Sequence, residues 1–292
     1  IIKGGFFMTR RRFPVGKTLL YGFMSLWALT TIYPFIWVIL NSFKPRGLIR
    51  SDTFSLPIGD KFTLENYVTA FKRVDIGTAY VNSIVISGAV TVVVMVLAGL
   101  AAYAMVRYSF RLRGFLHSMI IASMMFPVFS TIIPVFRMES SWGIVNTGSI
   151  WLTRLSVVLP QIAGNLSFAI IVLMGFIRSL PVDLEEAAYL EGYNVYQIFF
   201  RIIMPLAKPS FATVGIFTFL WSYNDLFLQM FFLRSKKFFT ITRLLNEISS
   251  QAGTNYGLMV AAVVMVVIPV LVVYIFLQNY IIKGMTAGAV KG

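Results

Sequence analysis

The chain has 292 residues, of which 58% are hydrophobic and 12% are charged, about half the charged share of an ordinary soluble domain. Lysine and arginine outnumber acidic residues by 25 to 11, which gives a net charge of +14. The absence of cysteine excludes disulfides and thiolate sites, and a single histidine argues against histidine-based metal or triad chemistry. Long apolar runs indicate a polytopic membrane protein, so the positive charge indicates anionic lipid rather than nucleic acid as a partner.

The first expected span is the apolar run Thr18–Ser42, which follows a basic segment, residues 1–17. A basic stretch before an apolar run can be a signal peptide. This run is too long for the apolar core of a signal peptide, and no small-residue cleavage site follows it. We therefore expect an uncleaved membrane helix.

Five further runs are long enough to cross a bilayer, which takes about 20 apolar residues. They are Val81–Val106, Phe115–Phe136, Ile150–Phe176, Ser210–Phe232 and Leu258–Ile282. Several runs contain proline, which membrane helices tolerate when neighbours satisfy the freed carbonyls. The sequence therefore predicts an all-α, polytopic membrane protein with six transmembrane helices in one domain, residues 18–292.

Six spans place both termini on the same face of the membrane. The 25 basic residues divide almost evenly between the two faces, but short loops next to spans carry the most weight, and the Arg107–Arg113 turn holds three arginines. A triple arginine near the N-terminus indicates that the N-terminus lies on the same side of the membrane as this turn. We therefore predict cytoplasmic termini, with Phe43–Tyr80, Arg137–Gly148 and Leu233–Tyr256 outside.

The connection between the fourth and fifth runs, residues 179–209, is longer than an ordinary connector of about two to eight residues. Acidic residues cluster near the start of its first predicted helix, where the helix dipole favours them: Asp183, Glu185 and Glu186. Ala187 and Ala188 keep one helix face thin, and Gly192 is suited to end the helix. A thin acidic helix with an exposed tip favours docking to another protein; an ordinary cytoplasmic connector is the alternative.

The second half of this insert predicts another short helix. Asn194 and Gln197, three residues apart, are typical of a capping box at its start. Apolar residues then recur at helical spacing: Val195, Ile198, Phe199, Ile202 and Ile203. Pro205 and Pro209 are expected to end the insert before the fifth span.

The segment Glu186-Ala187-Ala188, with Gly192 and then Ile203-Met204-Pro205, resembles the EAA coupling loop of ABC-importer permeases. Five more segments resemble the carbohydrate branch of that family: Tyr33-Pro34, Asn41–Pro45, Phe62–Tyr67, Trp221–Asp225 and Gly284–Gly292. These matches run from about residue 30 to the end and are most similar to the six-span subunits of maltose-type importers. The sequence as a whole also resembles the permease subunits of bacterial alginate importers. Tyr189 departs from the pattern, because relatives often carry a small residue there.

The resemblance implies an ABC type I importer permease fold with cytoplasmic coupling helices, in a bacterial inner membrane. It implies three kinds of protein partner: a second permease subunit, two ABC ATPase subunits, and a periplasmic or extracellular solute-binding protein. The chain has no Gly-x-x-x-x-Gly-Lys-Ser/Thr phosphate loop. ATP and Mg are therefore expected in the partner ATPases, and this chain is expected to be no enzyme and to hold no cofactor or metal.

The resemblance also assigns roles to particular residues. ATPase coupling is expected at Glu185, Glu186, Ala187, Ala188, Gly192, Pro205, Ala289 and Lys291. The last two belong to the tail, residues 283–292, for which a disordered end is the alternative. Binding-protein contact is expected at Arg234, Lys236, Lys237 and Arg243, for which a solvated basic loop is the alternative.

Polar residues inside the predicted spans are candidates for the substrate path. Gln161 and Asn165 lie four residues apart near the middle of the fourth span, so they share a face and either join helices or line the path. Ser130 and Thr131, in the third span, are weaker candidates. Asn224 and Asp225 lie in the outer half of the fifth span, where they line the path, reach the outer interface or cap a broken helix.

Charge gives a weak indication of the substrate. The predicted outer face carries 12 basic and 7 acidic residues, a net charge of +5, which favours an acidic oligosaccharide such as one from alginate. An acidic binding protein explains the same charge equally well.

An ion-gradient-driven secondary transporter is the main alternative to an ATP-driven importer. Such transporters often carry acidic residues at mid-membrane, and here none is expected near the centre of any span. The capped insert would also have no role in such a protein. A membrane enzyme is disfavoured, because no set of catalytic residues is evident. We therefore predict a permease subunit of an ATP-driven oligosaccharide importer.

Overall fold

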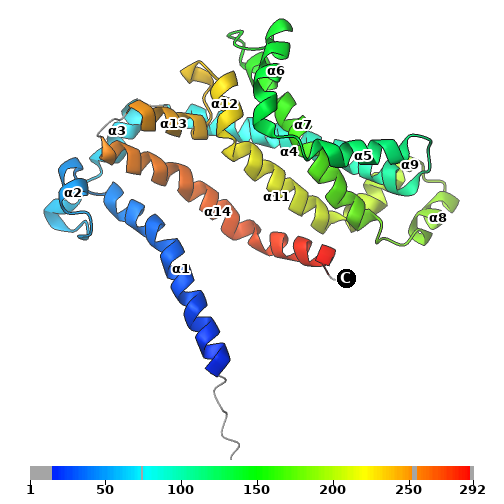
Figure 1. Ribbon diagram of the computed structural model, residues 1–292, viewed down its shortest axis with the longest axis horizontal. Helices are drawn as coiled ribbons and strands as arrows, with labels where there is room; N and C mark the ends of the chain where they lie inside the picture. The colour runs from blue at the N-terminus through cyan, green and yellow to red at the C-terminus, as the bar shows by residue number, and fades with distance from the viewer. Residues whose placement is uncertain (1–14, 74, 252–254, 290–292) are drawn as a thin grey trace, which may run out of the picture.

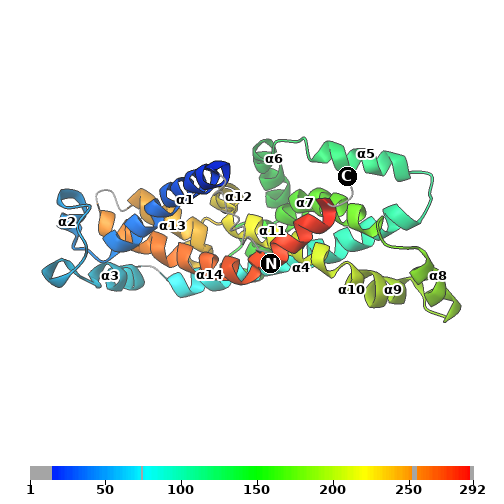
Figure 2. The same ribbon diagram turned by 90° about the horizontal axis from the view of Figure 1, so that it is seen from below.

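The computed structural model describes residues 15–73, 75–251 and 255–289, and every regular element within them is a helix. Four long helices give the molecule its shape (Figure 1): α1 (Val15–Ser42), α4 (Ile76–Arg107), α7 (Ile150–Ile177) and α14 (Tyr256–Ala289). Short helices gather at opposite ends (Figure 2): α2 (Arg46–Ser51) and α3 (Glu65–Arg73) at one, and α8 (Asp183–Leu190), α9 (Val195–Ile198) and α10 (Met204–Leu206) at the other. The all-α prediction is confirmed.

Three described helices are long and apolar enough to cross a membrane, namely α1, α4 and α7. The number rises to five if each of two bent helix pairs is one span. Helix α14 has 34 residues, and its first part, Tyr256–Val272, is also apolar. Within the described residues, the prediction of six spans is therefore supported only in part.

The predicted third span is a broken one. Helices α5 (Arg113–Ser123) and α6 (Val128–Ser141) meet at 104°, so the predicted span Phe115–Phe136, for which proline kinks were allowed, is broken into two helices. The break falls at Pro127, whose extended backbone precedes α6 and whose ring disfavours helix in the residue before it. Hydropathy continues across this break, so the apolar run alone did not reveal it.

The predicted fifth span is broken as well. Helix α11 (Lys208–Asn224) ends at Asp225, and α12 (Leu226–Phe232) begins directly after it. Asp225 has an extended backbone, and its carboxylate accepts a hydrogen bond from the backbone N–H of Leu228 at 3.1 Å. Of the alternatives considered for Asp225, capping a broken helix is therefore confirmed.

Helix α4 lies at the centre and packs along α7 and α11. Its buried face repeats every fourth residue, as helix packing requires: Ile86, Val90, Val94, Ala98 and Ala102. Gly99 lies on the same helix against two aromatic rings, and a Cβ there would come within 2.8 Å of Phe211 and 3.0 Å of Phe199. A side chain at Gly99 would therefore force α4 away from α11 and from the insert.

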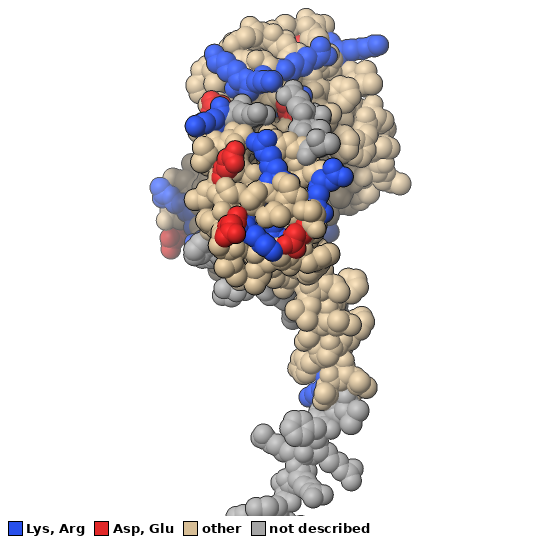
Figure 3. Space-filling view, turned by 90° about the vertical axis from the view of Figure 1, so that its left-hand side faces the viewer, with Lys and Arg blue, Asp and Glu red and all other residues tan. Residues whose placement is uncertain are grey.

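Helix α1 is splayed away from the rest of the chain (Figure 1), and none of its most apolar window is buried. Seen from the α2 end, its described part is a column of almost only uncharged residues (Figure 3). A helix that is apolar all round requires lipid or another protein around it. Helix α1 is therefore available for contacts outside this chain.

The segment after α1 is folded, although it was predicted as a loop. The Asn66 amide donates to the carbonyls of Ser42 and Lys44 at 2.9 and 2.8 Å, which joins α3 to the end of α1. The Lys44 ammonium donates to the carbonyls of Asp52 and Thr53, both at 2.9 Å. Burial lowers the pKa of Lys44. The segments Asn41–Pro45 and Phe62–Tyr67 thus have a structural role, since their hydrogen bonds hold α3 against the end of α1.

Candidate functional site

The insert at the end opposite α2 forms as the sequence predicts. The three predicted acids occupy the first turn of α8, and Gly192 ends the helix with a φ of +84°, which only glycine adopts at no steric cost. The capping box is confirmed, because Asn194 and Gln197 exchange two side chain-to-backbone hydrogen bonds, each 2.9 Å long. This end of the chain therefore holds a short helix with a fixed beginning and end.

The second helix of the insert differs in detail. After α9, the chain forms a π-helical segment, η2 (Phe199–Ile203), whose Phe199 and Ile203 are buried. Val195, expected on the apolar stripe, is exposed. Pro205 lies inside α10, and the chain bends by 82° between Leu206 and Lys208, so the insert ends between the two prolines predicted to end it, Pro205 and Pro209.

Glu185 points into the chain rather than out of it. Only 4% of the residue is exposed, and its carboxylate accepts hydrogen bonds from Arg107 Nε at 2.5 Å and from the Tyr103 hydroxyl at 2.8 Å. The Arg107 guanidinium also donates to the Leu180 carbonyl at 2.9 Å. The prediction that Glu185 contacts an ATPase is therefore corrected: this carboxylate joins α8 to the end of α4.

The outward face of α8 is formed by residues other than Glu185. Glu186 and Ala187 are exposed, whereas Ala188 is buried beneath the helix. Ala188 therefore serves the internal packing of the insert, whereas Glu186, Ala187 and the turn at Gly192 belong to the exposed surface of this end.

Tyr189 adds a second connection between α8 and α4. Its hydroxyl lies 3.0 Å from that of Tyr108, the residue that follows α4, and this hydrogen bond raises the pKa of Tyr189 to about 12. The departure from the family pattern at Tyr189 is thus accommodated by Tyr108, directly after the spanning helix α4. Arg107 and Tyr108 were noted in the sequence only as part of a basic turn, so neither contact was predicted.

The C-terminal residues continue a long helix. Helix α14 runs through Ala289, so the predicted tail, residues 283–292, is helical over most of its length. Lys291, the other tail residue predicted to meet an ATPase, lies outside the described residues.

A polar cluster lies where α7 passes the break between α11 and α12. Gln161 on α7 donates to the Asp225 carboxylate at 3.0 Å and accepts from the Ser222 hydroxyl at 2.6 Å. Gln229 on α12 donates to the Ser222 carbonyl at 3.2 Å. The break in the fifth span thus exposes backbone groups that side chains of three helices satisfy.

Four of the six predicted path residues meet at a cavity of about 450 Å³ beside this cluster: Gln161, Asn165, Asn224 and Asp225. Phe129, Phe227 and Trp221 supply aromatic surface to the same cavity. Thr131 lines an adjoining cavity of about 420 Å³. The Ser130 hydroxyl donates to the Pro127 carbonyl, and Ser130 lines neither cavity, so it does not join the group.

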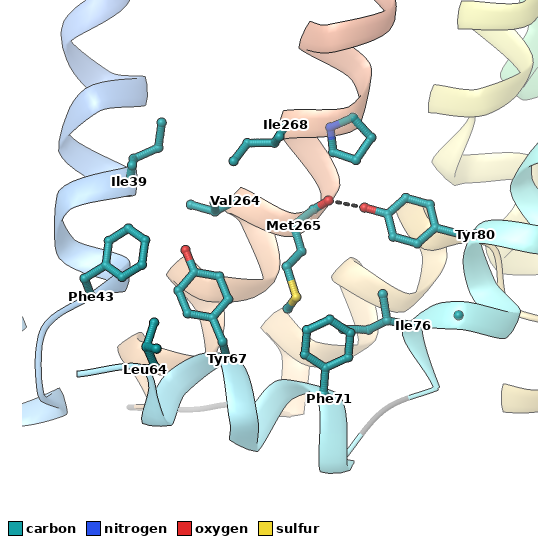
Figure 4. A pocket seen from close by; sticks show the side chains of 12 residues that line it. Ile39, Phe43, Leu64, Tyr67, Phe71, Ile76, Tyr80, Val264, Met265 and Ile268 are labelled. Atoms are coloured by element: carbon teal, nitrogen blue, oxygen red, sulfur yellow. Dashed lines mark hydrogen bonds between the residues drawn. The ribbon is translucent and has the colours of Figure 1, made fainter.

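A third cavity, of about 510 Å³, is apolar and is lined by α1, α3, α4 and α14 (Figure 4). Its two hydroxyl groups have partners within the chain, since Tyr67 pairs with Ser42 and Tyr80 donates to the Met265 carbonyl. The lining therefore offers a saccharide no unpaired hydroxyl, and the polar cavity is the better candidate site.

The basic segment that was predicted to lie outside, Leu233–Tyr256, is more ordered than a solvated loop. After η3 (Lys236–Phe238), α13 (Ile241–Gln251) packs on α4 and α14. Arg234, Lys236 and Lys237 are exposed, but Arg243 is half-buried, paired with Glu247 at 3.0 Å and stacked over Phe239. The prediction that Arg243 reaches a binding protein is therefore corrected: this guanidinium serves the packing of α13. Among the described residues, no three metal-ligating side chains gather.

Comparison with known proteins gives consistent similarities. Residues 95–287 match the family described as binding-protein-dependent transport system inner membrane component. The chain is 33% identical to the diacetylchitobiose uptake system permease of Streptomyces coelicolor, over 93% of this chain and 88% of that one. It is 30% identical to the arabinooligosaccharides transport permease of Halalkalibacterium halodurans, over 98% and 100%.

The fold is that of a solved transporter chain. A crystal structure of a bacterial ABC transporter involved in the import of the acidic polysaccharide alginate matches with a TM-score of 0.77. The alignment covers 95% of this chain and 99% of that chain at 24% sequence identity, which shows a shared fold.

Proposed function

The chain belongs to the family of binding-protein-dependent transport system inner membrane components, and we propose that it is one of two permease subunits in an ATP-driven oligosaccharide importer. Two relatives at 30% identity or more are named for diacetylchitobiose and arabinooligosaccharides, which supports an oligosaccharide as the substrate class. The cavity with polar groups and aromatic surface supports the same class.

The observation that carries the proposal is the construction of α8. Its outward face is exposed at Glu186 and Ala187, while Glu185 on its inner side is held by a buried ion pair to α4. A helix that is rigidly attached on one side and open on the other is suited to transmit a partner's movement. The sequence contains no phosphate loop, which supports a separate ATPase subunit as that partner.

The path from α8 to the substrate runs through α4. Helix α4 packs along both α7 and α11, which carry the polar cluster. When ATP closes the ATPase pair, α8 moves with it, and α4 moves through the Arg107–Glu185 contact. The packed helices then shift together, which changes the side of the membrane to which the cavity opens.

The remaining partners follow from the exposed surfaces. The unburied apolar helix α1 supports contact with a second permease subunit and with lipid. The exposed Arg234, Lys236 and Lys237 support contact with the solute-binding protein. Lys237 lies beside Asn82 near the start of α4, whereas α8 is attached to the end of that helix. In this arrangement α8 and both termini are cytoplasmic, and the tail with Ala289 and Lys291 makes a second ATPase contact.

The test is a charge reversal on the open face of α8. The complex, reconstituted in liposomes with its ATPases and binding protein, is assayed for uptake and ATP hydrolysis with Glu186→Lys. We expect uptake to be lost while the complex stays assembled, because Glu186 makes a charge-assisted contact with the ATPase. Asp60→Lys, the same charge change at the opposite end of the chain, is the control and should keep uptake and ATP hydrolysis coupled. Normal uptake in Glu186→Lys would contradict the proposal.

A further inference from the structure

The polar cavity at the α11–α12 break has an unequal supply of hydrogen-bond donors and acceptors. The donors of Gln161 are used within the chain, since its amide nitrogen bonds to Asp225 and lies 3.5 Å from the Ser222 carbonyl. The Ser222 hydroxyl is likewise used on Gln161. These groups hold the two broken helix ends to α7 and leave little donor capacity for a ligand.

Asn165 contributes a hydrogen-bond acceptor that no donor of the described chain satisfies. Its amide nitrogen donates to the Gln161 carbonyl at 2.8 Å, but its side-chain oxygen is buried and has no partner among the described residues. The residue is only 8% exposed, yet it lines the cavity. A buried acceptor without a partner is costly, so a donor from a ligand would stabilise this site.

Two more residues extend the acceptor surface. Asn224 donates its amide nitrogen to the Leu220 carbonyl at 2.8 Å, which leaves its side-chain oxygen to accept. Asp225 accepts from the Gln161 amide and the Leu228 backbone, and its carboxylate brings negative charge to the cavity. Among the described residues that line the cavity, there is no lysine, arginine or histidine.

The aromatic side of the cavity offers a different contact. Trp221 is 47% exposed and is supported from behind by Phe168, with ring centroids 4.9 Å apart. Phe129 and Phe227 pack edge to face at the same distance. An apolar wall beside a few fixed polar groups is the usual composition of a small-molecule site.

We propose that this cavity is a saccharide subsite that selects uncharged sugar units over uronates, an inference that rests on the proposed function above. Sugar hydroxyls donate to the side-chain oxygens of Asn165, Asn224 and Asp225, and the apolar ring face lies against Trp221. A uronate carboxylate would find no cationic side chain among the described residues that line this cavity, and it would face the like charge of Asp225. The net positive charge predicted for the outer face of the chain then serves contact with the binding protein rather than attraction of an acidic substrate.

The test measures saccharide binding to the complete permease–ATPase complex without the binding protein, so that the selectivity of the binding protein does not enter. Two oligosaccharides of equal length and linkage are compared, one with hydroxymethyl groups at C6 and one with carboxylates. We expect saturable binding of the neutral sugar at least about tenfold tighter than that of the uronate. Asn165→Leu should weaken neutral binding about fivefold, whereas Ser130→Ala, outside the cavity, should leave it unchanged.

Asp225→Asn tests the charge itself. It keeps the size of the side chain and removes the negative charge, so the preference for the neutral sugar should narrow. Equal or tighter binding of the uronate by the unmodified complex would overturn the inference, as would the absence of saturable binding by either sugar. ATP-driven uptake with the binding protein is measured separately, so an overturned subsite leaves the proposed function standing on its own result.

Discussion

The ion pair between Arg107 and Glu185 gives the sharpest prediction, because it is the main polar link between the insert and the spanning helices. Arg107→Ala leaves the Glu185 carboxylate buried without its charge partner. We expect α8 to detach locally from α4 in this variant while the spanning helices remain folded. Uptake should then fall although ATP is still hydrolysed.

The expected size of the effect follows from burial. The two side chains are only 11% and 6% exposed, so water screens the pair little. Breaking a buried ion pair by removing one partner costs about 3–5 kcal/mol. That energy corresponds to a local opening of α8 that is about 10²- to 4 × 10³-fold more frequent. Glu185→Gln removes the charge but keeps the shape, so its cost should be smaller, about 1–3 kcal/mol.

Hydrogen exchange measures this opening directly. The backbone amides of α8 should lose protection in Arg107→Ala by the factor above, while those of α7 keep theirs. Glu186→Gln is the matched control, since it neutralises the exposed neighbouring acid and should leave α8 protection unchanged. The charge exchange Arg107→Glu with Glu185→Arg should restore part of the protection.

Two results would refute the reasoning. Unchanged protection of α8 in Arg107→Ala would mean that the ion pair does not hold the insert. Full loss of uptake with unchanged protection would mean that Glu185 acts on a partner instead, as the sequence alone suggested.

Three further predictions follow from single positions. Gly192→Ala places a side chain at a φ of +84°, which costs about 1–2 kcal/mol, so a lower unfolding temperature of the insert is expected and an unchanged one would argue against the turn. Gly99→Leu should separate α4 from Phe199 and Phe211 and reduce the yield of assembled complex, whereas Gly88→Leu, with open space around it, should not. Deletion of residues 286–292 should lower coupled ATP hydrolysis without unfolding the spans, and unchanged coupling would remove the tail from the ATPase contacts.

Local patterns in the sequence predicted local structure well. The run Ile150–Phe176 became α7 with one more residue, and the capping box at Asn194 and the stop at Gly192 formed as expected. Each of these features depends on residues within a few positions of one another, so the sequence contains the whole signal.

Contacts between distant residues could not be predicted in the same way. Arg107 and Glu185 are 78 positions apart, and nothing near either residue indicates the other. Glu185 and Glu186 look alike in the sequence, yet the turn of the helix buries one and exposes the other. The helix break at Pro127 was also missed, because the apolar run continues through it, whereas a broken helix at Asp225 was one of the alternatives that the sequence left open.

The candidate substrate path could be predicted from the sequence only in part. The four-residue spacing of Gln161 and Asn165 predicted that they share a helix face. Asn224 and Asp225 were chosen as candidates because a buried acidic residue is energetically costly in a membrane. That all four meet at one cavity depends on the break after α11, which only the three-dimensional structure shows.

The most direct test of the account is the energy source of uptake. Liposomes that contain this chain with its partner subunits are loaded with ATP or with buffer, the binding protein and labelled oligosaccharide are added outside, and ion gradients are absent. The account predicts uptake only with ATP inside, and its loss in Glu186→Lys. Uptake without ATP that follows an imposed proton or sodium gradient would contradict the account and indicate an ion-driven transporter.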